Sequence, residues 1–443
     1  MALNSMPNNK APGDDGLTVL LYKKFWKELS KPLLDCLREN IIKGEMTTSQ
    51  KRSVIRLIQK KGKDPTLVKN WRPISLLNID SKIFSKCIAE RIRLPMKYLI
   101  HEDQKAFIKG RLMAENIIEL QTTLQKLELE NTKAAVLNID FQKAFDTIDH
   151  EALWKTMEAF GYGKNLIHLC KTLYKGATSC TINNGYTSQR FEVGRSCRQG
   201  DCVSPYLFLL IIEPLLSKLR LTLPKLRTSI GQARTVFAYA DDCNLIVVSN
   251  RQVSIILGVL EEFGEFSGLR INKDKSDILC LRTWNRNGDN IQGIKITDNI
   301  TVTGTRISAS AECDNEFNLN TALDKIQSTI ESLSGRNLSL AGKSLIINSK
   351  IFGMLMHHFR HNILTPPQIK RINRMIFKFI WNGPDKVKRE IIRKKFKHGG
   401  LNIMEPHNVN NAALMAWLQK PPLEGEGTED TDLWKKELKK HFN

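Results

Sequence analysis

The sequence has no CxxC pair and no apolar run long enough to cross a membrane. Its nine cysteines lack the paired spacing of a zinc knuckle or a disulfide framework, so we expect reduced thiols. The longest apolar stretch, 206–216, is interrupted by Glu213 and Pro214 and is too short to span a bilayer. The first ten residues lack the apolar core of a signal peptide. We therefore expect a soluble intracellular protein, in the nucleus or the cytoplasm, with no membrane partner.

Negative charge is also scarce. The 443 residues include 67 lysines and arginines against 46 aspartates and glutamates, a net charge of +21. Hydrophobic residues make up 41% and charged residues 26%, which excludes a wholly disordered chain. Between Arg360 and Lys397 only Asp385 and Glu390 oppose the basic residues. This excess predicts a polyanionic partner, with nucleic acid the first candidate.

The hydrophobic pattern of the middle third predicts an antiparallel sheet with helices on one face. Short apolar strands are expected at 134–139, 235–239, 244–248 and 277–281, and helices at about 151–160 and 253–266. The second and third strands would form a hairpin. This order is typical of the split βαβ, or ferredoxin-like, arrangement. The last third is predicted to be helical and basic, and the acidic run 424–432 is expected to be a solvated linker.

Three carboxylates occupy positions where acidic side chains would contribute little to the stability of the fold. Asp140 ends an apolar strand, and Asp241 and Asp242 stand at the turn of the predicted hairpin. If these strands share a sheet, the carboxylates meet at one edge, where their repulsion favours divalent cations. Oxygen ligands of this kind suit Mg²⁺, and two ions could activate a hydroxyl and stabilise a leaving pyrophosphate. The alternative is that the Asp-Asp pair is ordinary turn chemistry.

Residues close to Asp140 admit structural interpretations as well. Asp149 is expected to cap the following helix, and Asp146 is expected only to stabilise the start of a helix. Phe145 either packs in the core or forms a wall against a bound sugar. His357, His358 and His361 have no cysteine nearby, so we expect surface or core histidines rather than metal ligands.

Five ordered strings resemble the motifs of reverse transcriptases, most closely those of non-LTR (LINE-type) retrotransposons. They are WRPIS at 71–75, LNIDFQKAFD at 137–146, RQGDCVSP at 198–205, FAYADD at 237–242 and GLRINKDKS at 268–276. The resemblance extends from about residue 9 to about residue 400. It implies an α+β fold, a right-hand polymerase with fingers, a ferredoxin-like palm, a helical thumb and a basic helical C-terminal extension.

The resemblance also implies domain boundaries. The N-terminal extension and fingers would cover 1–133, and the palm 134–316, with a finger insertion at about 161–195. The thumb would cover 317–365 and the basic post-thumb segment 366–443. A thumb of this charge would grip an RNA–DNA hybrid through its phosphates.

The same resemblance assigns roles at the metal site. Asp140 and Asp241 would ligate two Mg²⁺ ions, with Mn²⁺ as an alternative ion, and Asp242 would lie beside them. Phe145 would reject a ribose 2′-hydroxyl. The implied partners are an RNA template, a DNA primer and a dNTP; the oligomeric state stays open.

Further residues are assigned to the nucleotide. Gln199 and Gly200 would line the pocket, where glycine permits close backbone approach. Lys60 and Arg72 would hold the triphosphate, the alternative being generic template contact. Lys275 would protonate the leaving pyrophosphate, the alternative being a solvated lysine.

The sequence departs from the family pattern in ways that leave two functional interpretations open. No endonuclease precedes the polymerase motifs, no cysteine follows Cys313, and Thr303-Gly304 replaces the Leu-Gly expected at the primer grip. The first two departures suggest a truncated copy. The chain is therefore expected to be an RNA-directed DNA polymerase or, alternatively, a catalytically inactive nucleic-acid-binding remnant of a retrotransposon polyprotein.

Overall fold

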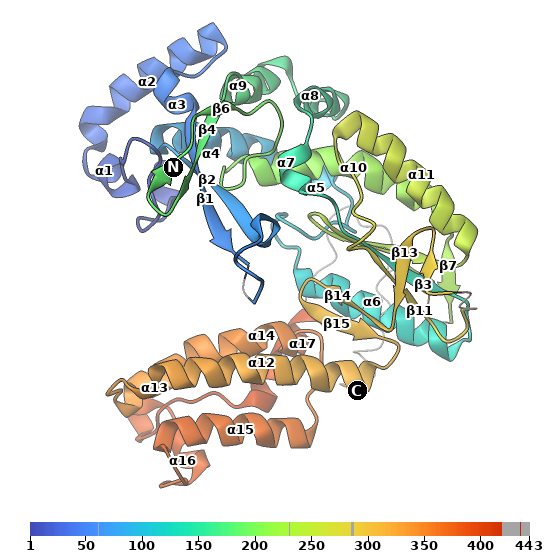
Figure 1. Ribbon diagram of the computed structural model, residues 1–443. Coiled ribbons are helices and arrows are strands. Elements are labelled where there is room, and N and C mark those ends of the chain that lie inside the picture. The colour runs from blue at the N-terminus through green and yellow to red at the C-terminus, as the bar shows by residue number, and fades with distance from the viewer. Residues whose placement is uncertain (61, 230, 285–287, 419–434, 436–443) are drawn as a thin grey trace. The chain divides into compact units, whose positions relative to one another are not determined.

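The structure is a computed structural model that describes residues 1–60, 62–229, 231–284, 288–418 and 435 (Figure 1). The acidic run 424–432 lies outside the described residues. The chain divides into two compact units. Unit 1 comprises Met1–Arg111, Ile139–Thr222 and Arg251–Lys275, and unit 2 comprises Leu112–Asn138, Leu223–Asn250 and the described part of 276–443. Each is described by itself below.

Unit 1 contains a five-stranded sheet in the order β2-β1-β4-β5, with β6 also paired to β4. Strand β1 is antiparallel to β2, from Ser53 opposite Leu77 to Gln59 opposite Trp71, and is parallel to β4. This register places Lys60 and Arg72 near the hairpin end of the β1–β2 ribbon. The strands are β1 (Arg52–Gln59), β2 (Trp71–Leu77), β4 (Thr178–Asn183), β5 (Tyr186–Thr187) and β6 (Phe191–Glu192).

The helices of unit 1 begin and end at recognisable residues. Asp149 caps α8, since its Oδ1 accepts hydrogen bonds from the backbone N–H groups of Glu151 at 2.9 Å and Ala152 at 3.1 Å, as predicted. Helix α2 ends at Gly44, which has φ +69°. The helices are α1 (Val19–Lys24), α2 (Trp26–Lys43), α3 (Thr48–Lys51), α4 (Ile79–Arg93), α5 (Met96–Leu99), α7 (Ala144–Thr147), α8 (His150–Ala159), α9 (Lys164–Tyr174), α10 (Ser204–Thr222) and α11 (Asn250–Ser267).

Unit 2 contains a six-stranded sheet in the order β12-β13-β11-β3-β10-β9. The strands are β3 (Ala135–Ile139), β9 (Val236–Tyr239), β10 (Asp242–Val247), β11 (Asp277–Cys280), β12 (Asn290–Ile291) and β13 (Ile294–Thr297). Numbered along the chain, β3, β9, β10 and β11 lie in the sheet in the order fourth, first, third, second (β11-β3-β10-β9). This is the ferredoxin-like order, so the predicted α+β class and palm sheet are confirmed.

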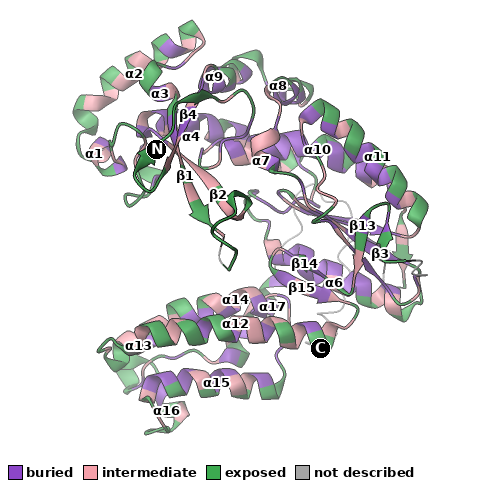
Figure 2. Ribbon diagram, in the orientation of Figure 1, coloured by how far each residue is buried: buried purple, intermediate pink, exposed green. Residues whose placement is uncertain are grey.

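One face of this sheet packs on helix α6 (Met113–Leu129). Leu120, Leu124 and Leu127 of the helix form one buried cluster with sheet residues that include Val136 and Ile246. Figure 2 shows most of the sheet in the colour of buried residues. Two separate hairpins complete the strands of the unit: β7 (Leu226–Thr228) with β8 (Gly231–Ala233), and β14 (Asn299–Val302) with β15 (Thr305–Ser308).

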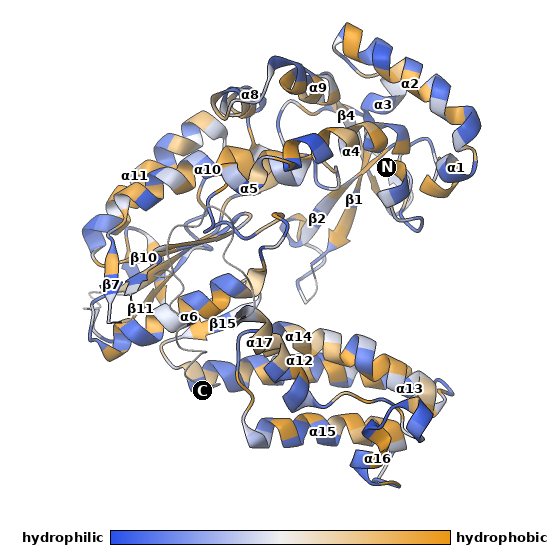
Figure 3. Cartoon of the chain, turned by 180° about the vertical axis from the view of Figure 1, so that it is seen from behind, coloured by the Kyte–Doolittle hydropathy of each residue, from blue (hydrophilic) through white to orange (hydrophobic). Residues whose placement is uncertain are grey.

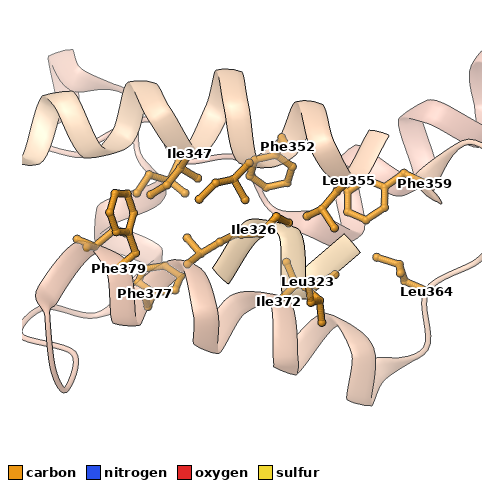
Figure 4. Packing of buried hydrophobic residues seen from close by; sticks show 14 of the residues in the cluster. Leu323, Ile326, Ile347, Phe352, Leu355, Phe359, Leu364, Ile372, Phe377 and Phe379 are labelled. Carbon is orange, nitrogen blue, oxygen red and sulfur yellow. The ribbon is translucent and has the colours of Figure 1, made fainter. Parts of the chain in front are cut away.

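The described chain after β15 is helical, as predicted. Its helices are α12 (Ala311–Ser334), α13 (Leu340–Ile346), the π-helix η3 (Ile347–Ile351), α14 (Phe352–Phe359), α15 (Pro366–Trp381), α16 (Arg389–Arg393) and α17 (Pro406–Leu418). Figure 4 shows Phe352 and Leu355 of α14 packed with Ile326 of α12 and Phe377 of α15. Apolar and polar residues alternate along α15 in Figure 3, because one face joins this cluster while the other carries its basic residues.

The three histidines lie in this helical region. His358 is 3% exposed, and His361 is 6% exposed, with its ring centroid 5.1 Å from that of His357. Among the described residues no three His, Cys, Asp or Glu side chains form a metal-binding group. No described helix is both long and apolar enough to cross a membrane.

Burial lowers the pKa of His358 to about 4, so the ring is neutral in the folded protein at pH 6. The unfolded chain binds a proton below pH ~6.5, so stability is lost as pH falls from about 6.5 towards 4. For His358 alone the loss approaches roughly 3 kcal/mol. We predict that His358→Gln, which does not titrate, shows a shallower fall in urea midpoint between pH 7.5 and 4.5. Identical pH slopes for variant and wild type would contradict this.

Candidate active site

In unit 1, the segment that follows β3 lies beside the segment that follows α11. The backbone N–H of Asn272 donates a hydrogen bond to the carbonyl oxygen of Asp140 at 2.7 Å. Gly268 has φ +81°, and a Cβ there would lie 2.2 Å from the carbonyl oxygen of Thr147, so only glycine permits this approach. Two of the motifs identified in the sequence are therefore adjacent in space.

A cluster of positive charge surrounds Asp140. The Nζ of Lys275 lies 3.9 Å from Asp140 Oδ2, with both side chains partly exposed. The pKa of Lys60 lies below its usual value, first because of burial and then because of the charges of Lys275 and Arg72, while Asp140 opposes the shift. The structure thus brings together four predicted residues: Asp140, Lys60, Arg72 and Lys275.

The predicted pocket residues Gln199 and Gly200 lie against strand β2. The backbone N–H of Ser75 donates to the carbonyl oxygen of Gln199 at 2.9 Å. Gly200 has φ +104°, and a Cβ there would lie 2.7 Å from the carbonyl oxygen of Ser75. The glycine is therefore required by the approach of its own chain, a reason that the sequence alone does not reveal.

Asp146 has a role that was not predicted. It lies in the first turn of α7, as expected, but its Oδ1 also accepts a hydrogen bond from Gln199 Nε2 at 3.4 Å. Burial raises the pKa of Asp146, while Lys143 and the bond from Gln199 oppose that shift. Asp146 therefore orients Gln199. Nothing local in the sequence indicated this, since the two residues are 53 positions apart.

Phe145 stacks on Phe208 of α10, with ring centroids 4.3 Å apart and ring planes 17° apart. Its side chain is partly buried, and its carbonyl oxygen accepts a hydrogen bond from the backbone N–H of Cys197 at 2.6 Å. One face of the ring therefore packs against the core, as the structural interpretation expected. Such packing also fixes the ring rigidly, which a steric gate requires.

The turn that carries Gln199 is held by a buried ion pair. Arg198 Nη2 lies 3.3 Å from Asp201 Oδ2, with side chains 3% and 0% exposed. The guanidinium also donates to the carbonyl oxygen of Leu173 and lies 4.6 Å from the ring centroid of Tyr174. Asp201 accepts further bonds from Ser85 Oγ and the backbone N–H of Cys202. This network was also missed by the sequence analysis.

In unit 2, Asp241 and Asp242 lie at the β9–β10 turn, as predicted. Ala240 adopts φ +55°, a left-handed conformation suited to a tight hairpin turn, and Asp241 is exposed. Asp242 Oδ1 accepts a hydrogen bond from Asn244 Nδ2 at 3.0 Å, and Oδ2 accepts one from the backbone N–H of Thr303 at 2.8 Å. The Asp242 carboxylate is thus held by protein donors on both oxygens.

The donor chemistry of these residues fits a hard cation. Asp140, Asp241 and Asp242 offer carboxylate oxygens, the ligands that Mg²⁺ prefers. No group of three such side chains within the described residues forms a ready-made metal cage. This does not conflict with Mg²⁺ chemistry, because Mg²⁺ is often held by one or two carboxylates together with substrate phosphates.

The helical region of unit 2 offers a positively charged surface. A cavity of about 480 Å³ lies between α12, α13 and α15. Its lining includes the apolar residues Met375 and Phe379 and five basic residues: Arg336, Lys343, Arg371, Arg374 and Lys378. Burial and the charge of Lys386 lower the pKa of Lys343. Such a surface is suited to binding an anionic polymer.

Comparisons with known proteins define the family. The family model described as "Reverse transcriptase (RNA-dependent DNA polymerase)" matches residues 58–327, more than half of the chain. A transposon TX1 uncharacterized 149 kDa protein from Xenopus laevis is 30% identical over 91% of this chain and 31% of its own length. The Pol polyprotein of the retrotransposable element R2 from Popillia japonica is 26% identical over 60% of this chain and 36% of its own.

Among solved structures, apo telomerase from Candida tropicalis matches with a TM-score of 0.47 at 13% identity, covering 93% of this chain and 74% of that chain. The chain belongs to the reverse transcriptase family. The prediction of a reverse transcriptase whose relatives are non-LTR retrotransposon proteins is confirmed. The chain spans about a third of the length of the curated relatives named above.

The buried Arg198–Asp201 pair generates a stability prediction. Asp201→Ala leaves a buried guanidinium without its carboxylate, which typically costs ~3–5 kcal/mol. We expect a lower urea midpoint, measured by circular dichroism. Asp385→Ala breaks the partly exposed Arg389–Asp385 pair (2.7 Å) and should cost no more than ~1 kcal/mol. Equal effects of the two substitutions would contradict the structural role of Asp201.

Proposed function

We propose that this chain is the catalytic core of a LINE-type RNA-directed DNA polymerase. It copies an RNA template by joining dNTPs to the 3′-hydroxyl of a DNA primer. The single observation that carries the proposal is that two of the reverse transcriptase motif strings include neighbouring strands of one sheet: β3, which ends at Ile139 just before Asp140, neighbours β10, which begins at Asp242.

Asp140 and Asp241 are proposed to hold two Mg²⁺ ions, or Mn²⁺ in their place, with Asp242 beside them. The ions would activate the primer hydroxyl and neutralise charge on the phosphates. The strand pattern supports the placement of Asp242, which stands two residues before Asn244 on β10; Asn244 is hydrogen-bonded at 2.8 Å to Asn138, which comes two residues before Asp140 in the sequence. Residues two apart on a strand share a face.

The remaining residues are proposed to handle the nucleotide. Lys60 and Arg72 bind the triphosphate, whose negative charge would relieve the repulsion among the basic side chains near Asp140. Lys275, adjacent to Asp140, donates a proton to the leaving pyrophosphate. Gln199, oriented by Asp146, lines the pocket together with Gly200.

We further propose that residues 1–133 are the N-terminal extension and fingers and that 134–316 are the palm, with a finger insertion at about 161–195. Residues 317–365 would be the thumb and 366–443 a basic segment after it. The basic cavity of unit 2 supports an RNA–DNA partner, since phosphate contacts give affinity without sequence choice. An intracellular location completes the proposal.

Primer extension tests the activity. With poly(A), oligo(dT), dTTP and Mg²⁺, we expect the wild type to extend the primer and Asp241→Asn to be slower by ~100-fold or more, because a metal ligand is lost. Asp289→Asn, an exposed residue before β12, is the matched control and should retain activity. RNA binding by the wild type without any extension would instead support the inactive remnant.

The sugar gate is tested by shortening Phe145. Removing the ring should admit a ribose 2′-hydroxyl, so Phe145→Val should lower the preference for dTTP over UTP by ~10–100-fold in kcat/KM. Phe145→Tyr retains the ring and its stacking on Phe208 and should keep the preference. Unchanged sugar discrimination in Phe145→Val would remove this role and leave Phe145 as a core residue.

A further inference from the structure

A line of polar side chains crosses the six-stranded sheet next to the Asp-Asp turn. Asn138 Nδ2 donates to Asn244 Oδ1 at 2.8 Å, and Asn244 Nδ2 donates to Asp242 Oδ1 at 3.0 Å. Asn138 also stands opposite Asp277 in the β3–β11 register. All of these residues belong to unit 2, and Asn244 is 1% exposed.

The two strands repeat the same series of side chains in opposite directions. Along β10 the face reads Asp242, Asn244, Ile246, and along β3 the residues preceding Asp140 at the same spacing are Asn138 and Val136. Val136 and Ile246 belong to the apolar cluster beneath α6. The side-chain amides of Asn138 and Asn244 therefore form a polar layer between the apolar cluster beneath α6 and the end of β10 where Asp242 lies.

The bond from Asn138 decides which way the Asn244 amide points. An asparagine side chain has an acceptor oxygen on one side and a donor nitrogen on the other. Because Asn138 donates to the Asn244 oxygen, the Asn244 nitrogen is directed at Asp242. Without Asn138, the amide could turn and present its oxygen to the carboxylate.

A second support comes from another part of the chain. The backbone N–H of Thr303, in the β14–β15 turn, donates to Asp242 Oδ2 at 2.8 Å. Thr303 and Gly304 both have positive φ, +47° and +86°, as a tight two-residue turn requires. With one donor on each oxygen, the Asp242 carboxylate has a fixed orientation.

We propose that Asn138 and Asn244 are positioning residues that orient Asp242 for the catalytic metal ions, with the Thr303 amide as the second support. This inference rests on the proposed function. Partners that fix the orientation of metal-ligating or neighbouring carboxylates typically change metal affinity 10- to 100-fold when they are lost. The Asn138–Asn244 bridge therefore sets the metal affinity of the polymerase without touching substrate.

The test is Mn²⁺ binding by the full chain at pH 8, measured from the EPR signal of free Mn²⁺ with MnCl₂ alone. Asn244→Leu removes the donor to Asp242 without adding charge and should weaken binding about 10-fold. Asn138→Asp replaces a donor by an acceptor, so the Asn244 nitrogen turns towards position 138 and its oxygen faces Asp242.

Asn138→Asp separates orientation from charge. An added carboxylate alone would attract Mn²⁺ and tighten binding, whereas misorientation of Asp242 weakens it, and we expect about 10-fold weaker binding. Asn290→Asp makes the same chemical change at an exposed site on strand β12 of the same sheet and is the matched control. Binding by Asn138→Asp that equals or exceeds the wild type overturns the inference.

Two further measurements complete the experiment. Extension by Asn138→Asp should recover at saturating Mg²⁺, with a raised apparent KM for the ion, whereas a rate that stays low at every concentration indicates structural damage and overturns the inference. Asp241→Asn is the reference for the site. If it leaves Mn²⁺ binding unchanged, the metal site of the proposed function fails; if it weakens binding while both asparagine variants match the wild type, only this inference fails.

Discussion

The pairing of β3 with β10 is the constraint on which the rest of the structure depends. These two short strands come from segments about a hundred residues apart, and their adjacency is fixed by backbone pairing and by the Asn138–Asn244 amide bond. A shift of one residue would move every side chain of the strand to the other face. Asp242 would then change faces, and Val136 and Ile246 would leave the cluster under α6. Core packing and the Asn138–Asn244 hydrogen bond thus select the same register.

In unit 1, several of the predicted site residues are held by buried polar contacts rather than by apolar packing alone. Arg198 and Asp201 fix the turn that carries Gln199, Asp146 orients its amide, and the carbonyl of Ser75 leaves room only for glycine at position 200. Buried polar groups are costly unless every partner is present. This makes the geometry of the pocket specific, because an altered arrangement would leave donors or acceptors unsatisfied.

Much of the fold could be predicted from sequence periodicity. The strands β3, β9, β10 and β11 and the cap at Asp149 follow from alternation and local chemistry, and the structure confirms them. The boundary between α1 and α2 at Phe25, by contrast, is not evident from the sequence, because no proline or glycine marks it. Residue roles at the metal site remain predictions, drawn from the motif strings and not from geometry.

The contacts that sequence analysis missed share one cause. The Asp146–Gln199 hydrogen bond joins residues 53 positions apart, and the Asp242–Thr303 bond joins residues 61 positions apart. Arg198 pairs with Asp201, whose local sequence indicates only a turn. Contacts between side chains that meet only after the chain has folded do not appear in the hydrophobic periodicity of the sequence. Local propensity therefore identified the strands and helices, whereas the hydrogen bonds that hold Asp242 and Gln199 in place became visible only in the structure.

The contact from the β14–β15 turn to Asp242 is made by the main chain of residue 303. Its side chain takes no part in that bond, which explains how threonine can stand where related chains are expected to carry leucine. The carboxylate therefore depends on the main chain of this turn and on its length rather than on the identity of the side chain at 303, apart from proline, which has no N–H to donate. The insertion or deletion of one residue would direct a different backbone amide, or none, towards Asp242. The hairpin must therefore keep its length even where its sequence changes.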